Sequence, residues 1–147
     1  MNIMIVGVGG QGTLLASRIL GKVAIKEGYD VKVSEVHGMS QRGGSVVTYK
    51  MIANTQKMNP MPVITGAMEY PENIEEKLSA KINLQAVDAL SLAEKAGTIK
   101  AVNVVLIGLL AKSMDVDKNV WIDVIKETVP EKFLDVNIKA FELGYEL

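Results

Sequence analysis

The residue types best suited to chemistry lie in two glycine-rich segments of the first third of the chain. The first segment, Gly7-Val-Gly-Gly-Gln-Gly12, has the spacing G-x-G-x-x-G. In a strand–turn–helix setting, such glycines let the backbone turn tightly and approach a ligand, and the N–H groups at the start of the helix face an anion such as a phosphate group. A glycine turn that only packs a helix closely on a sheet has the same spacing. The motif therefore predicts a phosphate-binding turn, with a packing turn as the alternative.

The second segment is Glu35-Val-His-Gly-Met-Ser-Gln-Arg-Gly-Gly44. Arg42 offers a planar cation with five donors beside flexible backbone, so it is a candidate clamp for an anion. Glu35 stands where dinucleotide-binding folds place an acid that binds a ribose hydroxyl, and His37 has a side chain that titrates near neutral pH. The chain has no cysteine and no second histidine, so neither segment supplies a recognisable nucleophile and base. We expect a binding loop for a ligand or partner, without a catalytic residue.

Local sequence patterns predict the elements that position these segments. Residues 3–8 are continuously apolar, which is typical of a strand buried on both faces of a parallel sheet. Apolar residues at near-helical spacing follow from Leu14 and predict a helix that ends at Gly28. A second strand is predicted over 31–36, which completes a βαβ unit. Because ligands bind beside the carboxyl ends of such strands, both segments should meet at one edge. The candidate binding residues are Gly7, Gly9, Gly10, Gln11, Gly12, Glu35, His37, Gly38, Ser40, Gln41, Arg42, Gly43 and Gly44.

Composition excludes several classes of function. The 147 residues include 16 Lys+Arg and 17 Asp+Glu, and this balance lacks the basic excess of a nucleic-acid-binding surface. Without cysteine and with one histidine, the chain cannot ligate an iron–sulfur cluster or form a multi-histidine metal site. The longest apolar stretch, 101–111, is shorter than the ~20 residues that span a bilayer. No basic segment precedes 3–8, so we expect a cytoplasmic protein without a signal peptide or membrane contact.

The remaining two thirds of the chain are predicted to be mostly helical. Helices are expected over 71–79, from Asp88 to Lys95 with an end at Gly97, over 101–111, over 120–128 with Asp117 as the cap, and from Pro130 to an end at Gly144; a strand is expected over 82–87. Five methionines lie between residues 39 and 68. Their flexible thioethers suit an adaptable partner surface and core filling equally well. The predicted fold is a single α/β domain, with a Rossmann-like three-layer parallel sheet and a helical C-terminal layer.

Together, the two glycine-rich motifs resemble the gamma-type domain of the 2-oxoacid:ferredoxin oxidoreductases, and the resemblance extends over nearly all of residues 1–147. It is strongest for the small subunits that serve indolepyruvate. The resemblance implies an enzyme subunit that acts in the oxidative decarboxylation of a 2-oxoacid with coenzyme A, to give an acyl-CoA and carbon dioxide. It also implies that Gly9 to Gly12 and Gln41 to Gly44 contribute to a coenzyme A site.

The same resemblance implies a large partner subunit. Thiamine diphosphate and the iron–sulfur clusters that pass electrons to ferredoxin are expected there, since this chain has no cysteine and no recognisable thiamine motif. The chain is then active only with its partner and contains no complete active site. Two alternatives remain open from the residues themselves: a free-standing NAD-dependent dehydrogenase, with Glu35 on a ribose, and a nucleotide-binding module without turnover.

The chain departs from the family pattern near Lys50 and Met51. Members of the family continue from a strand such as Ser45–Tyr49 through a further strand and helix before the strand that begins at Ile52. Here the two strands follow each other directly, so a unit of about 30 residues or more is missing. Either the protein has lost this unit or the printed chain omits a stretch. Loss of a core strand would leave the apolar edges of the neighbouring strands exposed, so we favour the omission. A continuous strand from Tyr49 to Ile52 would contradict that preference.

Overall fold

The computed structural model describes residues 1–7, 12–34 and 50–147. The chain divides into two compact units, one of Met1–Arg42 with Ala89–Leu147 and one of Gly43–Asp88. We call them unit 1 and unit 2 and describe each by itself. No helix in the described ranges is long and apolar enough to cross a membrane.

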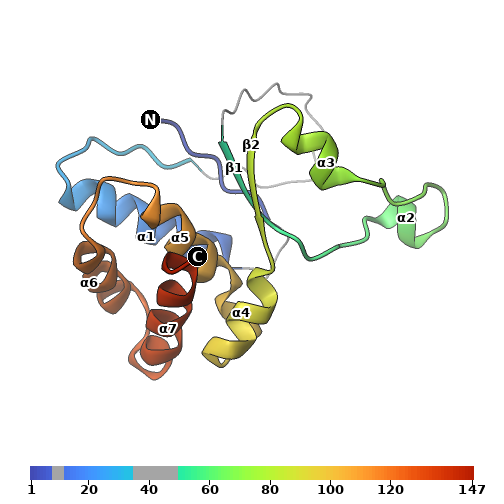
Figure 1. Cartoon of the computed structure of the whole chain (residues 1–147). Coiled ribbons are helices and arrows are strands. Elements are labelled where there is room, and N and C mark those ends of the chain that lie inside the picture. Colours follow the sequence, from blue (N-terminus) through green and yellow to red (C-terminus); the bar gives the residue numbers. More distant parts are fainter. Residues whose placement is uncertain (8–11, 35–49) are drawn as a thin grey trace. The chain divides into compact units, whose positions relative to one another are not determined.

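Unit 2 contains the sheet formed by the described residues (Figure 1). Strands β1 (Lys50–Asn54) and β2 (Asn83–Val87) pair in parallel, with Lys50 opposite Asn83 and Asn54 opposite Val87. Between them lie two short helices, α2 (Met61–Ile64) and α3 (Ile74–Ser79). The connection between parallel strands therefore passes through helical turns, as parallel pairing requires. The predicted strand over 82–87 and the predicted helix within 71–79 are confirmed.

Unit 1 is helical. It contains α1 (Thr13–Lys26), α4 (Ala89–Ala96), a 3-10 turn at Ile99–Ala101 that leads into α5 (Val102–Lys112), α6 (Lys118–Thr128), and a second 3-10 turn at Glu131–Phe133 that leads into α7 (Leu134–Tyr145). Helix α5 packs along α7 and also contacts α4 and α1, while α1 packs on α6. Trp121 of α6 and Phe141 of α7 are fully buried and stack with ring centroids 6.3 Å apart. Their rings join the two helices within one apolar core.

Local signals set the ends of these helices. At the end of α1, Gly28 has φ +82°, its N–H donates to the Ile25 carbonyl, and the Tyr29 N–H donates to the Ala24 carbonyl. This pair of bonds is a Schellman motif, which favours glycine at the left-handed position. Gly97 has φ +126° and ends α4 in the same way. Asp117 caps α6, because its Oδ1 accepts the Asn119 N–H at 2.7 Å. The predicted stops at Gly28 and Gly97 and the predicted cap at Asp117 are confirmed.

Two glycines let α5 and α7 approach each other until backbone touches backbone. A Cβ on Gly108 would collide with the Phe141 carbonyl oxygen, and a Cβ on Gly144 would collide with the Val105 carbonyl oxygen. The prediction that Gly144 ends the last helix is therefore wrong, since α7 continues to Tyr145 and Gly144 lies buried within it. Glycine is needed here for close packing of two helices and not for a turn.

The predicted three-layer parallel sheet is not present among the described residues, whose sheet has two strands. Residues 1–7 and 29–34, which fall within or beside the two strands predicted in the first third, form no strand. Val6 is 81% exposed and Val33 is 60% exposed. A strand needs a hydrogen-bonded neighbour, and neither segment has one in the described structure. The prediction of buried strands is therefore wrong for residues 3–7 and 31–34, which are unpaired and largely exposed in the described structure.

Strand β1 passes through Lys50, Met51 and Ile52 without interruption. This is the point at which the family pattern is broken in the sequence. Continuous strand from Tyr49 to Ile52 would contradict an omitted stretch, but Tyr49 lies outside the described residues. The described part of the junction is therefore ordinary, continuous strand.

Candidate anion-binding site at the start of helix α1

Gly12 begins α1 in a conformation that suits glycine. Its φ is +75° and its ψ is +26°, and its carbonyl accepts the Ala16 N–H as the first bond of the helix. A side chain in this left-handed conformation costs roughly 1–2 kcal/mol. The conformation of Gly12 therefore sets the direction from which the chain enters α1.

The first turn of α1 is open to an anion. No side chain caps it, and no acidic residue lies in it. The first N–H groups of a helix have no partner within the helix, and the helix dipole adds partial positive charge there. Helix α1 also carries Arg18, Lys22 and Lys26 and no acidic residue. The start of α1 can therefore hold a phosphate or carboxylate group.

Asn103 adds a polar side chain at this place. It is the one polar residue in the apolar stretch 101–111, and a polar side chain in such a stretch needs a hydrogen-bond partner. In the structure, a Cβ placed on Gly12 would lie 3.9 Å from Asn103 Nδ2. The start of α5 thus brings an amide to the start of α1. An isolated polar residue in an apolar helix is the sequence signal for this neighbour, but the signal does not say which residue it meets.

A groove in unit 1 joins the described parts of the first glycine motif. Gly7 and Gly12 both line it, together with Thr13 and Ser17 of α1 and the loop 113–116. Its volume is about 1780 Å³, larger than the 300–1,000 Å³ typical of a small-molecule pocket. Apolar side chains of 1–7 and 29–34 form much of its wall. It is therefore an open groove whose lining includes both described ends of the glycine motif.

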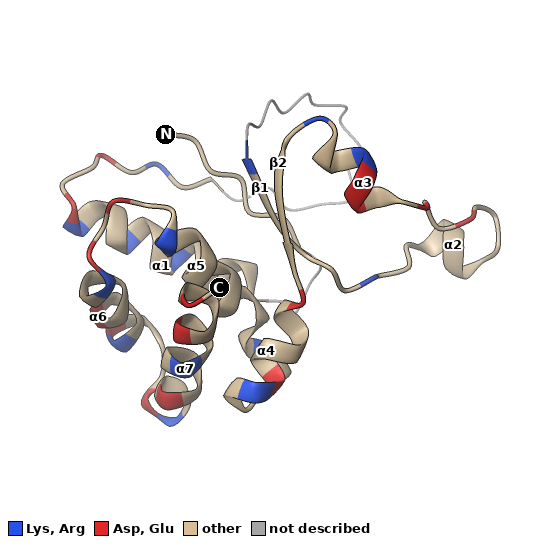
Figure 2. Ribbon diagram, viewed as in Figure 1, with Lys and Arg blue, Asp and Glu red and all other residues tan. Residues whose placement is uncertain are grey.

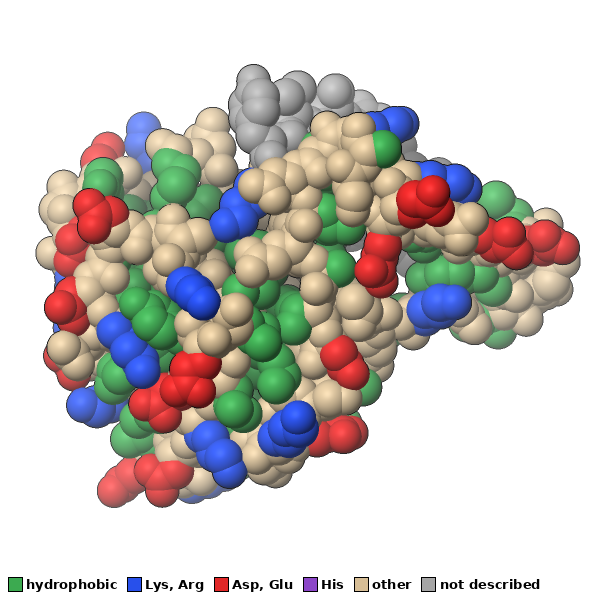
Figure 3. Space-filling model, in the orientation of Figure 1, with side chains coloured by type: hydrophobic (Ala, Val, Ile, Leu, Met, Phe, Trp, Pro, Cys, Tyr) green, Lys and Arg blue, Asp and Glu red, His purple; other side chains and the backbone are tan. Residues whose placement is uncertain are grey.

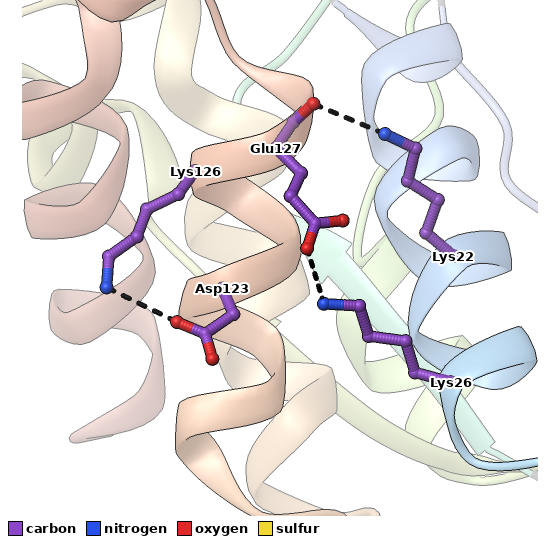
Figure 4. A network of polar contacts seen from close by, with 5 residues as sticks. All are labelled: Lys22, Lys26, Asp123, Lys126 and Glu127. Carbon is purple, nitrogen blue, oxygen red and sulfur yellow. Dashed lines mark hydrogen bonds and ion pairs between the residues drawn. The ribbon is translucent and has the colours of Figure 1, made fainter.

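Both lysines of α1 have structural partners on α6 (Figure 4). Lys26 Nζ lies 2.6 Å from Glu127 Oε1, and Lys22 Nζ donates to the Glu127 carbonyl at 3.3 Å, so both lysines bind the end of α6. Lys126 pairs with Asp123 along α6 at 3.3 Å. Figure 2 shows acidic and basic residues interspersed over α6 and α7. These groups fasten helices or face solvent.

Only two of the thirteen candidate binding residues lie within the described structure. Gly7 and Gly12 line the same groove, as expected for the two ends of one motif. The other eleven, and with them the expected meeting of the two glycine-rich segments, lie outside the described residues: Gly9, Gly10, Gln11, Glu35, His37, Gly38, Ser40, Gln41, Arg42, Gly43 and Gly44.

Comparison with known proteins places the chain in a family. A sequence model described as "Pyruvate ferredoxin/flavodoxin oxidoreductase" matches residues 2–67 and 50–147. The chain belongs to this family. It is 35% identical to the indolepyruvate oxidoreductase subunit IorB of Thermococcus kodakarensis over 190 positions, which take in 97% of this chain and 93% of the relative. The corresponding subunit of Pyrococcus horikoshii is 36% identical, with 97% of this chain and 93% of the relative covered.

A solved structure shares the fold. The gamma subunit of a keto/oxoacid ferredoxin oxidoreductase from Geobacter sulfurreducens aligns with a TM-score of 0.65 and 25% identity, over 95% of this chain and 93% of that one. The expected resemblance to gamma-type domains is confirmed, as is the expected class, a homologue of small subunits of 2-oxoacid:ferredoxin oxidoreductases. The alternatives, a free-standing dehydrogenase and a nucleotide-binding module, are not favoured by these relatives.

Proposed function

We propose that this chain is the small subunit of a cytoplasmic 2-oxoacid:ferredoxin oxidoreductase that acts on indolepyruvate or a related aryl 2-oxoacid. With a larger subunit, it would convert the 2-oxoacid and coenzyme A to acyl-CoA and carbon dioxide and pass the electrons to ferredoxin. The observation that carries the proposal is similarity to indolepyruvate oxidoreductase subunits over 97% of the chain.

The redox cofactors do not fit this chain. Iron–sulfur clusters are held by cysteine thiolates, and the sequence contains no cysteine. The described residues also contain no cluster of three or more His, Asp or Glu side chains arranged to hold a metal ion. We therefore assign the clusters, and thiamine diphosphate with them, to the larger subunit. What this chain supplies is a binding surface.

The start of α1 fits a phosphate group of coenzyme A. Its N–H groups are uncapped, Gly12 leaves space for the approach, and the Asn103 amide lies beside Gly12. We propose that Gly9 to Gly12 bind the phosphate through the backbone. Arg42, with Gln41 and the two glycines that follow it, would supply the second half of the site.

Activity of the assembled enzyme is the decisive test of the function. The chain is purified alone, the thiamine- and cluster-containing subunit is purified alone, and the two are mixed. We expect 2-oxoacid- and coenzyme A-dependent reduction of ferredoxin only in the mixture. Full activity of the larger subunit alone would contradict the proposal. NADH formation by this chain alone would establish the dehydrogenase alternative.

Calorimetry with coenzyme A, AMP and NAD tests the ligand. We expect the complex to bind coenzyme A, and Arg42→Ala to weaken this binding by roughly 1.5–3 kcal/mol, the value of a hydrogen bond to a charged group. Gly9→Val should block binding and leave the fold intact, because a branched side chain would fill the space of the ligand. Unchanged coenzyme A affinity in Arg42→Ala, with unchanged activity of the complex, would rule out the anion clamp.

We also propose that this chain lacks, near residues 50–51, a unit that its relatives contain. The alignment with the Thermococcus subunit has 190 positions but takes in only 97% of these 147 residues. The aligned positions that have no counterpart in this chain amount to a strand–helix unit or somewhat more. Strand β1 is continuous through Lys50 and Met51, where the family pattern is broken. Mass spectrometry of the purified protein separates the two explanations: a natural deletion gives 15.9 kDa and a Glu-specific peptide 36–69 with Tyr49 bonded directly to Lys50. Additional residues between Tyr49 and Ile52 would show that the printed chain omits a stretch.

A further inference from the structure

Residues 57–70 of unit 2 form a closed loop that we call the methionine arm. Pro60 leads into α2, the Val63 and Ile64 N–H groups donate to the Pro60 carbonyl, and after Gly66 the Met68 N–H returns to the Pro62 carbonyl at 3.0 Å. At the base of the arm, Lys57 Nζ lies 5.5 Å from the centre of the Tyr70 ring. Figure 1 shows α2 at the end of unit 2 away from β1 and β2.

The arm presents apolar side chains to solvent. Met61 is 67% exposed, Ile64 is 63% exposed and Met68 is 64% exposed, and Met58 is exposed beside them. Figure 3 shows hydrophobic side chains gathered on the arm next to acidic ones. Single exposed hydrophobics are ordinary, but several on one small element indicate an interaction surface. Of the two interpretations of the methionines, exposure excludes core filling for Met58, Met61 and Met68; Met51 is half-buried in β1, and Met39 lies outside the described residues.

The arm is ordered before it binds. Two prolines restrict its backbone, and the internal hydrogen bonds of 60–68 hold the turn closed. A surface that is already shaped loses less conformational entropy on association. Methionine side chains, in contrast, adapt to the contour of a partner. A fixed backbone with adaptable side chains suits a permanent contact with another protein.

The charge around the arm specifies the partner. Residues 57–81 contain four glutamates, at 69, 72, 75 and 76, and three lysines, at 57, 77 and 81; the stretch 69–76, directly after the arm's last methionine, is acidic without a basic residue. All four glutamates are exposed, and none makes an ion pair with a described residue. A second copy of this chain would bring the same acidic border against itself, and like charges across an interface are unfavourable. The complementary surface is an apolar cleft bordered by lysine and arginine.

We propose that the methionine arm is the element by which this chain docks on the larger oxidoreductase subunit, with Met61, Ile64 and Met68 in an apolar cleft whose basic border faces Glu69, Glu72, Glu75 and Glu76. This inference rests on the proposed function, which supplies the partner. It adds to that function the place of contact and the chemistry of the partner surface.

Affinity between the two purified subunits tests the proposal. The double variant Met61→Glu/Met68→Glu places carboxylates in the apolar cleft, and we expect the dissociation constant to rise at least tenfold. Met61→Ala/Met68→Ala is a milder second variant and should weaken binding in the same direction. Ile99→Glu is the matched control, because Ile99 is 57% exposed and belongs to unit 1; its affinity should equal that of the unaltered chain. Thermal melts verify that all variants fold.

Each outcome has a distinct meaning. If the unaltered chain does not bind the larger subunit, the proposed function fails, and the arm proposal with it. If the unaltered chain binds and both arm variants bind equally well, only the arm proposal is wrong. If the unaltered chain alone is a dimer that the arm variants convert to a monomer, with unchanged binding to the larger subunit, the arm contacts a second copy and the assignment of its partner is overturned.

Discussion

Helix α5 and the segment 1–7 are both rich in apolar residues, but their surroundings are opposite. On α5, Val104 and Val105 are at most 1% exposed, because α7 lies directly against them. In the segment 1–7, Val6 is 81% exposed, and the segment forms no strand. The two regions differ in whether the described chain supplies a surface to cover them. Apolar sequence thus predicts a tendency to be buried, and the neighbour decides whether burial is achieved.

The largest expected effect comes from the contact between α5 and α7. Gly144→Ala should lower the free energy of unfolding by about 3 kcal/mol or more, because the new Cβ meets the Val105 carbonyl and neither backbone can move without separating the helices. Chemical denaturation measures the loss. Lys112→Ala, on the exposed face of the same α5, is the control and should be near neutral. A mild effect of Gly144→Ala would mean that the helices lie farther apart than described.

A matched pair of substitutions tests the contrast between the two apolar regions directly. Val105→Thr places a hydroxyl in the core of unit 1 and should cost about 1–3 kcal/mol. Val6→Thr makes the same change at an exposed site and should stay within about 0.5 kcal/mol. Denaturation curves of both variants provide the comparison. Equal costs would show that residues 1–7 are buried in solution, as the predicted sheet requires.

Two glycines at opposite ends of α1 separate backbone strain from ligand binding. Gly12→Ala and Gly28→Ala both force a side chain into a left-handed conformation, so each should cost roughly 1–2 kcal/mol of stability. Only Gly12 lies at the candidate anion site. We expect calorimetry to show weakened coenzyme A binding for Gly12→Ala and unchanged binding for Gly28→Ala. A similar loss of coenzyme A affinity in both variants would show that the loss comes from lower stability and not from the candidate anion site.

The smallest expected effect is at the surface ion pair between α1 and α6. Lys26 and Glu127 are 38% and 51% exposed, and pairs of this kind contribute about 0.2–1 kcal/mol. Lys26→Ala should therefore lower stability by less than 1 kcal/mol at low salt, and by less again at high salt, where the pair is screened. Removing the Asp123–Lys126 pair, which lies within α6 alone, should cost even less. Melting temperatures at two salt concentrations resolve the difference.

The helices were predictable because their signals are local. Gly28, Gly97 and Asp117 each act on backbone within a few residues, so reading the sequence places these ends correctly. Gly144 was misread because its reason lies in Val105, on another helix. Such errors arise wherever contacts distant in sequence determine the role of a residue.

The site was predictable in part. The glycine motif predicted an open helix start, and the structure contains one at Gly12; the left-handed conformation of Gly12 was not predicted. The nearness of Asn103 could not be derived, because it depends on how α5 crosses the start of α1. The strands expected at 3–8 and 31–36 failed for a related reason: their pattern indicates burial on two faces and gives no information about which strands are available as neighbours.

Left-handed glycines at both ends fix the length of α1 as well as its direction. Within a helix, one inserted residue rotates everything that follows by about 100°. Between Gly12 and Gly28, neither end can absorb such a rotation by fraying one turn further. An insertion in the middle of α1 would swing Lys22 and Lys26 away from Glu127 and turn Ile19 or Val23 out of the core. Substitutions on the outer face of α1 should be tolerated in evolution far more readily than any change in its residue count.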